Sequence, residues 1–192
     1  MEIEPEIYCP ANKQEWRNWL EQNHKAKAAV WLVLHKKESN TKNLNWSEAV
    51  DEALCYGWID SVKKAIDSKT YKQYFGKRQP NSTWSKVNKE KVEALIEAGL
   101  MTEAGLKSIE IAKQNGSWFI LDSVENTEIP ADLDTILKRN PEARAYFLGL
   151  SKSVKKAILQ WLVLAKRPET RQKRIDEIAE NALEKRRPKQ FR

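Results

Sequence analysis

The sequence predicts an α+β protein, with a small, mainly antiparallel sheet covered by helices and a helical bundle at the C-terminal end. Residues 30–34 form an unbroken β-branched and aromatic run, as expected for a strand covered on both faces. Residues 58–66 alternate in polarity, as a strand does, and residues 70–77 are expected to form the second strand of a hairpin with them. From Ser85 onward, apolar residues recur mainly at helical spacing.

The chain is long enough to form two small domains. At 192 residues it can bury a core without disulfides or a structural metal. We expect an α+β domain at residues 1–124 and a helical region at residues 125–192, with a linker near residues 124–129.

Local signals set the elements of the first half. Asn12 is a helix cap before residues 13–23, and Ser47 is the expected cap of a helix over residues 48–56. Gly57 ends that second helix, because glycine readily adopts the left-handed conformation found after helix C-termini. Residues 1–10 read as an extended lead-in and residues 38–43 as a polar loop.

Alternation along the first hairpin strand assigns side chains to its two faces. Trp58, Asp60 and Lys64 fall on one face if the strand is regular, so Lys64 is a candidate ion-pair partner for Asp60. Asp67 and Ser68 then form the turn.

Capping residues and prolines divide the second half into helices. The expected helix starts are Ser85, Thr102, Pro130, Asn140-Pro141, Ser151 or Ser153, and Pro168. Ile96 and Leu106 are expected to face inward on their helices. Residues 117–129 read as a connector that packs its aromatic side chains, and residues 186–192 as a frayed basic tail.

Positive charge is concentrated in two segments. The chain carries a net charge of +7, yet residues 63–91 hold nine basic and two acidic side chains, and residues 152–192 hold thirteen and five. Such segments favour an anionic partner, although solvated helix and hairpin faces produce the same composition.

Several classes of protein are disfavoured. Cys9 and Cys55 are too few for a disulfide framework or a zinc site, and no His-rich cluster suggests a metal or another cofactor. Residues 1–8 are acidic and lack the apolar segment of an export signal. No run approaches the ~20 apolar residues of a membrane span, so we expect a cytoplasmic protein without membrane insertion.

Asp60 is the strongest candidate for a chemical role. A carboxylate between Trp58 and Val62 must be paired, hydrogen-bonded or neutral, because an isolated buried charge is costly. Its functional role would be a general acid/base in a small enzyme or an acid that orients a ligand. Its structural role would be a cap for backbone amides at a strand end. Ser61 points to the opposite face, so an Asp-Ser nucleophile pair is not expected, and no catalytic residue is assigned.

Aromatic and cationic residues alternate after the hairpin, as in surfaces that stack bases and neutralise phosphates. Arg78 would clamp a phosphate or carboxylate, and the N–H groups of the helix after Ser85 would assist. The candidate ligand-binding residues are Trp58, Asp60, Ser61, Lys64, Tyr74, Arg78, Trp84, Ser85, Lys86 and Asn88.

Three segments carry a family resemblance. LCYGWIDS at 54–61, NSTWSKVN at 81–88 and AKRPETR at 165–171 resemble the YdeI/OmpD-associated, or bacteriocin-protection, family over nearly the whole chain. The resemblance implies a role in protection from bacteriocins or cationic peptides, or association with a porin, and it carries over no catalytic residues. An association with a porin fits poorly with a chain that shows no export signal.

Three functional hypotheses follow. The first is a cytoplasmic module that binds an anion, with nucleic acid before a small molecule, in a groove between Asp60, Arg78 and Ser85. The second is an enzyme that uses Asp60 as acid/base on a phosphorylated or carboxylated small molecule. The third is a stress-protection protein that binds a protein partner through an exposed patch at Trp118 and Phe119.

Overall fold

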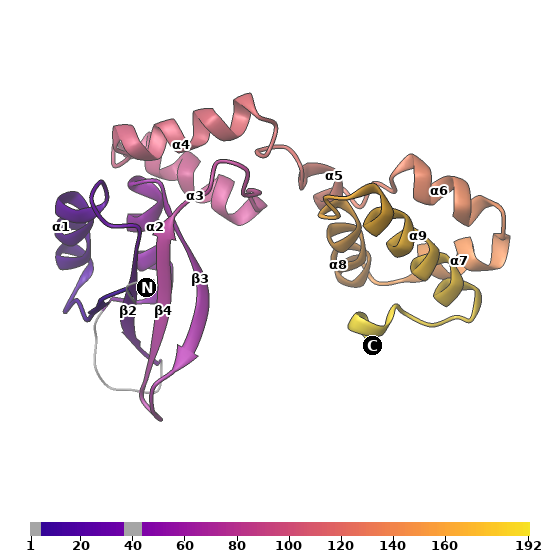
Figure 1. Cartoon of the computed structure of the whole chain (residues 1–192), viewed down its shortest axis with the longest axis horizontal. Coiled ribbons are helices and arrows are strands. Elements are labelled where there is room, and N and C mark those ends of the chain that lie inside the picture. Colours follow the sequence, from indigo (N-terminus) through magenta and orange to yellow (C-terminus); the bar gives the residue numbers. More distant parts are fainter. Residues whose placement is uncertain (1–4, 37–43) are drawn as a thin grey trace. The chain divides into compact units, whose positions relative to one another are not determined.

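A computed structural model describes residues 5–36 and 44–192 and divides the chain into two compact units. The first unit is Met1–Trp118 and the second unit is Phe119–Arg192. The polar loop expected at residues 38–43 lies outside the described residues. The α+β class is confirmed, with a four-stranded sheet in the first unit and helices in the second (Figure 1). The domain boundary expected at residue 124 and the linker expected near residues 124–129 stay predictions.

The sheet of the first unit is mainly antiparallel, with strand order β1-β2-β4-β3. Among the strands that the structure describes, only β1 and β2 pair in parallel. As expected, the apolar strand β2 is internal, and β3 and β4 form a hairpin. The strands are β1 Ile7–Tyr8, β2 Ala29–His35, β3 Trp58–Ala65 and β4 Thr70–Lys77.

Helices cover one face of this sheet. Trp16 of α1 contacts Phe75 of β4 with ring centroids 5.5 Å apart, and its Nε1 donates to the Ala49 carbonyl of α2 at 3.0 Å. These contacts place α1 and α2 on the sheet face that carries Phe75 (Figure 1). The helices of the first unit are α1 Lys13–Asn23, α2 Trp46–Cys55, α3 Lys86–Glu97 and α4 Glu103–Gln114.

The second unit is built from helices around a separate hydrophobic core. Its fully buried side chains include Phe147, Leu133 and Leu137. Its elements are α5 Asp122–Glu125, α6 Ala131–Lys138, α7 Pro141–Gly149, α8 Lys152–Val163, α9 Pro168–Leu183 and the 3-10 helix η1 Lys189–Phe191.

Four expectations about local structure are corrected. Asn45, not Ser47, caps α2, because it accepts from Glu48 N while the Glu48 carboxylate accepts from Asn45 N. Ile96 and Leu106 are each 45% exposed, since only the opposite stripes of α3 and α4 are buried. The C-terminal tail packs instead of fraying: the Phe191 ring meets Trp161 edge-on at 5.9 Å.

The hairpin contains the fourth correction. The pairing of β3 with β4 shifts register between Asp60 and Lys63, so regular alternation ends there. Asp60 stays on the helix-covered face opposite Phe75. Lys64 turns to the other face, where its Nζ lies 5.1 Å from the Trp31 ring. Lys64 is therefore not the partner of Asp60.

Candidate functional site

The sequence-predicted site residues do not converge on one groove. Trp58 and Arg78 line one pocket, and Asp60 and Ser61 line another. The remaining residues lie on the opposite sheet face, Lys64 and Tyr74, or at the start of α3, Trp84, Ser85, Lys86 and Asn88.

Asp60 sits in a pocket of about 240 Å³. Its Oδ2 atom accepts from Trp46 Nε1 at 2.9 Å and from Gln73 Nε2 at 3.2 Å. Burial, with a smaller contribution from Asp60, raises the pKa of Tyr71 in the same pocket. One carboxylate oxygen thus accepts from a donor on α2 and a donor on β4. In this arrangement Asp60 joins α2 to the hairpin as a structural acceptor.

The start of α3 uses its polar groups locally. The Ser85 hydroxyl accepts from Asn88 N at 3.3 Å, as the sequence predicts for a helix cap. Lys86 faces Glu90 at 3.6 Å. Trp84 is 1% exposed and contacts Trp118, which is 8% exposed, at 4.9 Å. Trp118 is thus buried, and the expected exposed patch at Trp118 and Phe119 is reduced to Phe119, which is 54% exposed.

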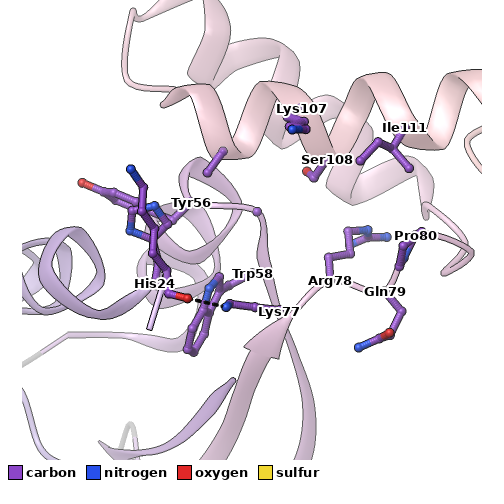
Figure 2. A pocket seen from close by; sticks show the side chains of 13 residues that line it. His24, Tyr56, Trp58, Lys77, Arg78, Gln79, Pro80, Lys107, Ser108 and Ile111 are labelled. Atoms are coloured by element: carbon purple, nitrogen blue, oxygen red, sulfur yellow. Dashed lines mark hydrogen bonds between the residues drawn. The ribbon is translucent and has the colours of Figure 1, made fainter. Parts of the chain in front are cut away.

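Arg78 and Trp58 line a pocket that is rich in cationic side chains, which we call the basic pocket. It has a volume of about 360 Å³. Its walls come from the end of α1, the α2–β3 junction, the exit of β4 and one face of α4 (Figure 2). The lining residues are His24, Lys25, Tyr56, Gly57, Trp58, Lys77, Arg78, Gln79, Pro80, Ala104, Lys107, Ser108 and Ile111.

Close backbone contact between α4 and the α2–β3 junction forms the roof of the basic pocket. Gly57 has φ +72°, and a Cβ there would lie 2.9 Å from the Ala104 carbonyl oxygen. A Cβ on Gly105 would overlap the Cys55 carbonyl oxygen. Thr102 Oγ1 donates to that same carbonyl at 2.6 Å. Two glycines and one threonine therefore hold α4 directly over the start of β3.

The face that α4 turns to the basic pocket follows from helical spacing. Ala104, Lys107, Ser108 and Ile111 stand at i, i+3, i+4 and i+7 and so share one side of the helix. Figure 2 shows Ser108 and Ile111 projecting from α4 toward the side of the pocket that holds Arg78.

The lining of the basic pocket is cationic. It contains Lys25, Lys77, Arg78 and Lys107, and none of its lining residues is an aspartate or glutamate. Lys77 Nζ donates to the Lys25 carbonyl at 2.7 Å, which joins the hairpin end to the end of α1. Four like charges around one concavity produce a positive potential that favours an anionic ligand.

Arg78 is the most deeply placed of these cations. Its guanidinium carbon lies 3.6 Å from the centroid of the Trp84 ring, and Nη2 donates to the Thr83 carbonyl. Desolvation lowers the pKa of Arg78 to about 10, against a smaller opposing effect of Asp60. Nε and Nη1 are buried and have no hydrogen-bond partner among the described residues. Unmet buried donors are costly, so these two N–H groups lower the stability of the first unit.

Trp58, another residue of this lining, also has a buried donor without a partner. Its side chain is 1% exposed, and its Nε1 is buried without a partner among the described residues. The basic pocket therefore combines cationic side chains with apolar walls such as Tyr56 and Ile111. Two of its lining residues, Trp58 and Arg78, carry buried N–H groups that lack acceptors among the described residues.

Sequence reasoning missed the contribution of α4 and of the end of α1. His24, Lys25, Lys107, Ser108 and Ile111 were not site candidates, because they are distant in the sequence from the hairpin. One signal was present: Lys107 and Ser108 interrupt an otherwise small or apolar stripe that also holds Ala104 and Ile111.

Other chemistries find less support in the described residues. Burial raises the pKa of the Cys55 thiol to about 11, so it is protonated at neutral pH and is a poor nucleophile. Within residues 5–36 and 44–192, no cluster of three or more His, Cys, Asp or Glu side chains could hold a metal ion. No helix in the described part of the chain has the length and apolarity to cross a bilayer.

Two family models match the chain in separate segments. Residues 8–108 match a domain of unknown function, DUF8412, and residues 126–185 match the family described as Bacteriocin-protection, YdeI or OmpD-Associated. The second match is shorter than the nearly complete coverage expected from the sequence motifs, and it contains only the motif at residues 165–171. Comparisons with curated proteins and with solved structures found no match.

Proposed function

We propose that the first unit of this chain, which belongs to the DUF8412 family through residues 8–108, is a binding module for a small organic anion. Residues 126–185 of the second unit match the YdeI/OmpD-associated family. The basic pocket is the proposed site. The observation that carries the proposal is its lining of four cationic side chains without a carboxylate.

The shape and lining of the basic pocket support a ligand with an apolar body and one anionic group. A volume of about 360 Å³ falls within the range of small-molecule sites. Tyr56, Trp58 and Ile111 offer apolar contact, while Arg78 and Lys107 offer charge. An inorganic anion alone would leave the apolar wall unused.

The enzyme alternative has less support. Asp60 would be its acid/base, but Asp60 lines a different pocket and accepts hydrogen bonds from Trp46 and Gln73 on one oxygen. We therefore assign no reaction to the basic pocket and no catalytic role to Asp60.

A matched pair of dyes tests the proposal on the full chain. The probes are 8-anilinonaphthalene-1-sulfonate, which has an apolar body and a sulfonate, and N-phenyl-1-naphthylamine, which lacks the charge. We expect one molecule of the sulfonate dye to bind per chain. Lys107→Glu should lower the affinity for this dye about tenfold, a loss of about 1.4 kcal/mol in binding free energy. Lys173→Glu, at an exposed position on α9 of the second unit, is the control.

Two results would reject the proposal. One is equal affinity for the charged and the neutral dye, which would indicate plain apolar adsorption. The other is a Lys107→Glu variant that binds the sulfonate dye as tightly as the Lys173→Glu control. Unchanged thermal melting of both variants establishes that the comparison concerns binding and not folding.

We also propose a cellular setting, a cytoplasmic role in protection from bacteriocins. The description of the family that matches residues 126–185 supplies this idea. Survival of sensitive cells that express the full chain tests it, with Lys107→Glu as the variant expected to lose protection. Cell fractionation of the tagged chain tests the location.

A further inference from the structure

The sheet face opposite α1 and α2 forms a second surface, which we call the open face. In β4, Phe75 faces the helices, so its neighbour Tyr74 faces away. Pairing then places further residues on this face, among them Ile7, Ala29, Trp31, Val33, Ile59, Lys64 and Lys72.

Aromatic rings and lysines meet at the centre of the open face. The Trp31 and Tyr74 rings are 5.1 Å apart in an edge-to-face arrangement. Lys72 Nζ lies 4.7 Å and Lys64 Nζ 5.1 Å from the centroid of Trp31. Two ammonium groups thus share one indole, and neither lysine forms a salt bridge with the residues that the structure describes.

The two lysines beside Trp31 give the open face a positive charge. Two like charges near one ring repel each other, and none of the residues assigned to the open face carries a compensating carboxylate. Each ammonium gains from the indole quadrupole, but the pair would gain more from an anion with at least two charges. A polyanion with regularly spaced charges satisfies both lysines at once.

The rings decide which polyanion fits. Trp31 is only 6% exposed because long side chains lie across it, whereas Tyr74 is half-buried. If Lys64 and Lys72 move to phosphates, the Trp31 ring becomes available for stacking. Bases that are free of a duplex stack on such rings, and proteins that bind single strands combine aromatic platforms with cations. An acidic peptide would use the charges but not the rings.

We propose that the open face binds single-stranded nucleic acid, with Lys64 and Lys72 at phosphates and Tyr74 and Trp31 against bases. This site is separate from the basic pocket, because Lys77 and Trp58 pair on the opposite, helix-covered side of the hairpin. The proposal therefore does not depend on the small-anion site.

Fluorescence anisotropy of a labelled 20-nucleotide oligothymidylate tests the proposal on the full chain. The test variant is Lys64→Gln with Lys72→Gln, and the control is Lys152→Gln with Lys173→Gln on exposed positions of the second unit. Both pairs lower the net charge by two. We expect the test pair to bind about tenfold more weakly and the control to bind within about twofold of the wild type. A plot of log affinity against log salt has a negative slope, and its magnitude should decrease by about 1.4 in the test pair, at about 0.7 per lost phosphate contact.

A third variant separates stacking from charge. Tyr74→Leu keeps an apolar side chain, so weaker binding with an unchanged salt slope is the expected signature of a lost stacking contact. Lys107→Glu, which addresses the basic pocket, should leave oligonucleotide binding within about twofold of the wild type.

Four outcomes would overturn the proposal. They are equal losses in the test and control pairs, no binding by the wild type at low salt, a duplex of the same length bound more tightly than the single strand, and polyglutamate or phosphatidylglycerol vesicles bound as tightly as the oligonucleotide. The last two would assign the open face to bulk electrostatics, an acidic protein or a membrane surface.

Discussion

The two compact units carry similar positive runs in the sequence but use their cations differently. In the second unit, Arg171 contacts both carboxylate oxygens of Asp132, at 2.6 and 3.0 Å, and Arg174 donates to the Trp161 carbonyl. In the first unit, Arg78 keeps two buried nitrogen atoms without acceptors. Charge composition alone does not distinguish cations whose donors are paired from a cation with unmet donors.

The unsatisfied polar atoms sharpen this contrast. Among the described residues, all the buried side-chain nitrogen and oxygen atoms without a hydrogen-bond partner belong to the first unit, in His35, Trp58, Arg78 and Trp84. The second unit satisfies its buried side-chain donors and acceptors internally. Since unmet buried groups cost stability, their concentration in one unit shows that the first unit carries a local cost that the second unit lacks.

Separate cores predict separate responses to the largest perturbation. Leu162 is fully buried in the hydrophobic core of the second unit, so Leu162→Ala should destabilise this unit by about 2–5 kcal/mol. Hydrogen exchange should increase across residues 119–192 and stay unchanged in the sheet. The matched control is Leu164→Ala, at a side chain 39% exposed. Equal loss of protection in both units would show that they unfold together.

A smaller effect should appear when the roof of the basic pocket is disturbed. A Cβ on Gly105 meets the Cys55 carbonyl, so Gly105→Ala should cost about 1–3 kcal/mol and weaken binding of the sulfonate dye. Gly149→Ala in the second unit is the control, because its Cβ meets no atom within 4 Å. Chemical denaturation measures both, and similar stabilities for the two variants would contradict the proposed close contact.

Arginine substitutions should separate the two uses of cations. Arg171→Met removes a bidentate contact and should destabilise the second unit by about 1 kcal/mol. Arg78→Met removes a desolvated charge with unmet donors, so the first unit should stay within about 1 kcal/mol of the wild type while dye binding falls. Thermal denaturation of both variants provides the comparison. A larger stability loss for Arg78→Met would make that residue primarily structural.

The smallest expected effect concerns acid stability. The hydrogen bond from Arg171 is the main reason that the pKa of Asp132 lies below its usual value of 3.8. A lowered folded-state pKa contributes stability that is present above the unfolded value and is lost as pH falls through the folded value. The difference between wild type and Asp132→Asn should therefore be largest at neutral pH, below about 1 kcal/mol, and vanish in strong acid. A difference that persists at acid pH would assign the effect to packing.

Local signals in the chain were sufficient for most elements. Asn12, Ser85 and Ser151 cap the helices that they were expected to cap, because a cap depends on hydrogen bonds within one turn. Gly57 ends α2 with φ +72°, and Pro168 begins α9, for equally local reasons. The YdeI/OmpD-associated resemblance was also correct, although its match covers residues 126–185.

Interactions between distant segments decided the rest. The register shift after Asp60 sent Lys64 to the open face, and the alternation of polarity contains no trace of that shift. The sequence alone determined that cations gather near Arg78, whereas packing of α4 on the α2–β3 junction brought Lys107 and Ile111 opposite them. Caps and periodicity act over a few residues, but a pocket requires backbone contacts between residues nearly fifty positions apart, such as Cys55 with Thr102.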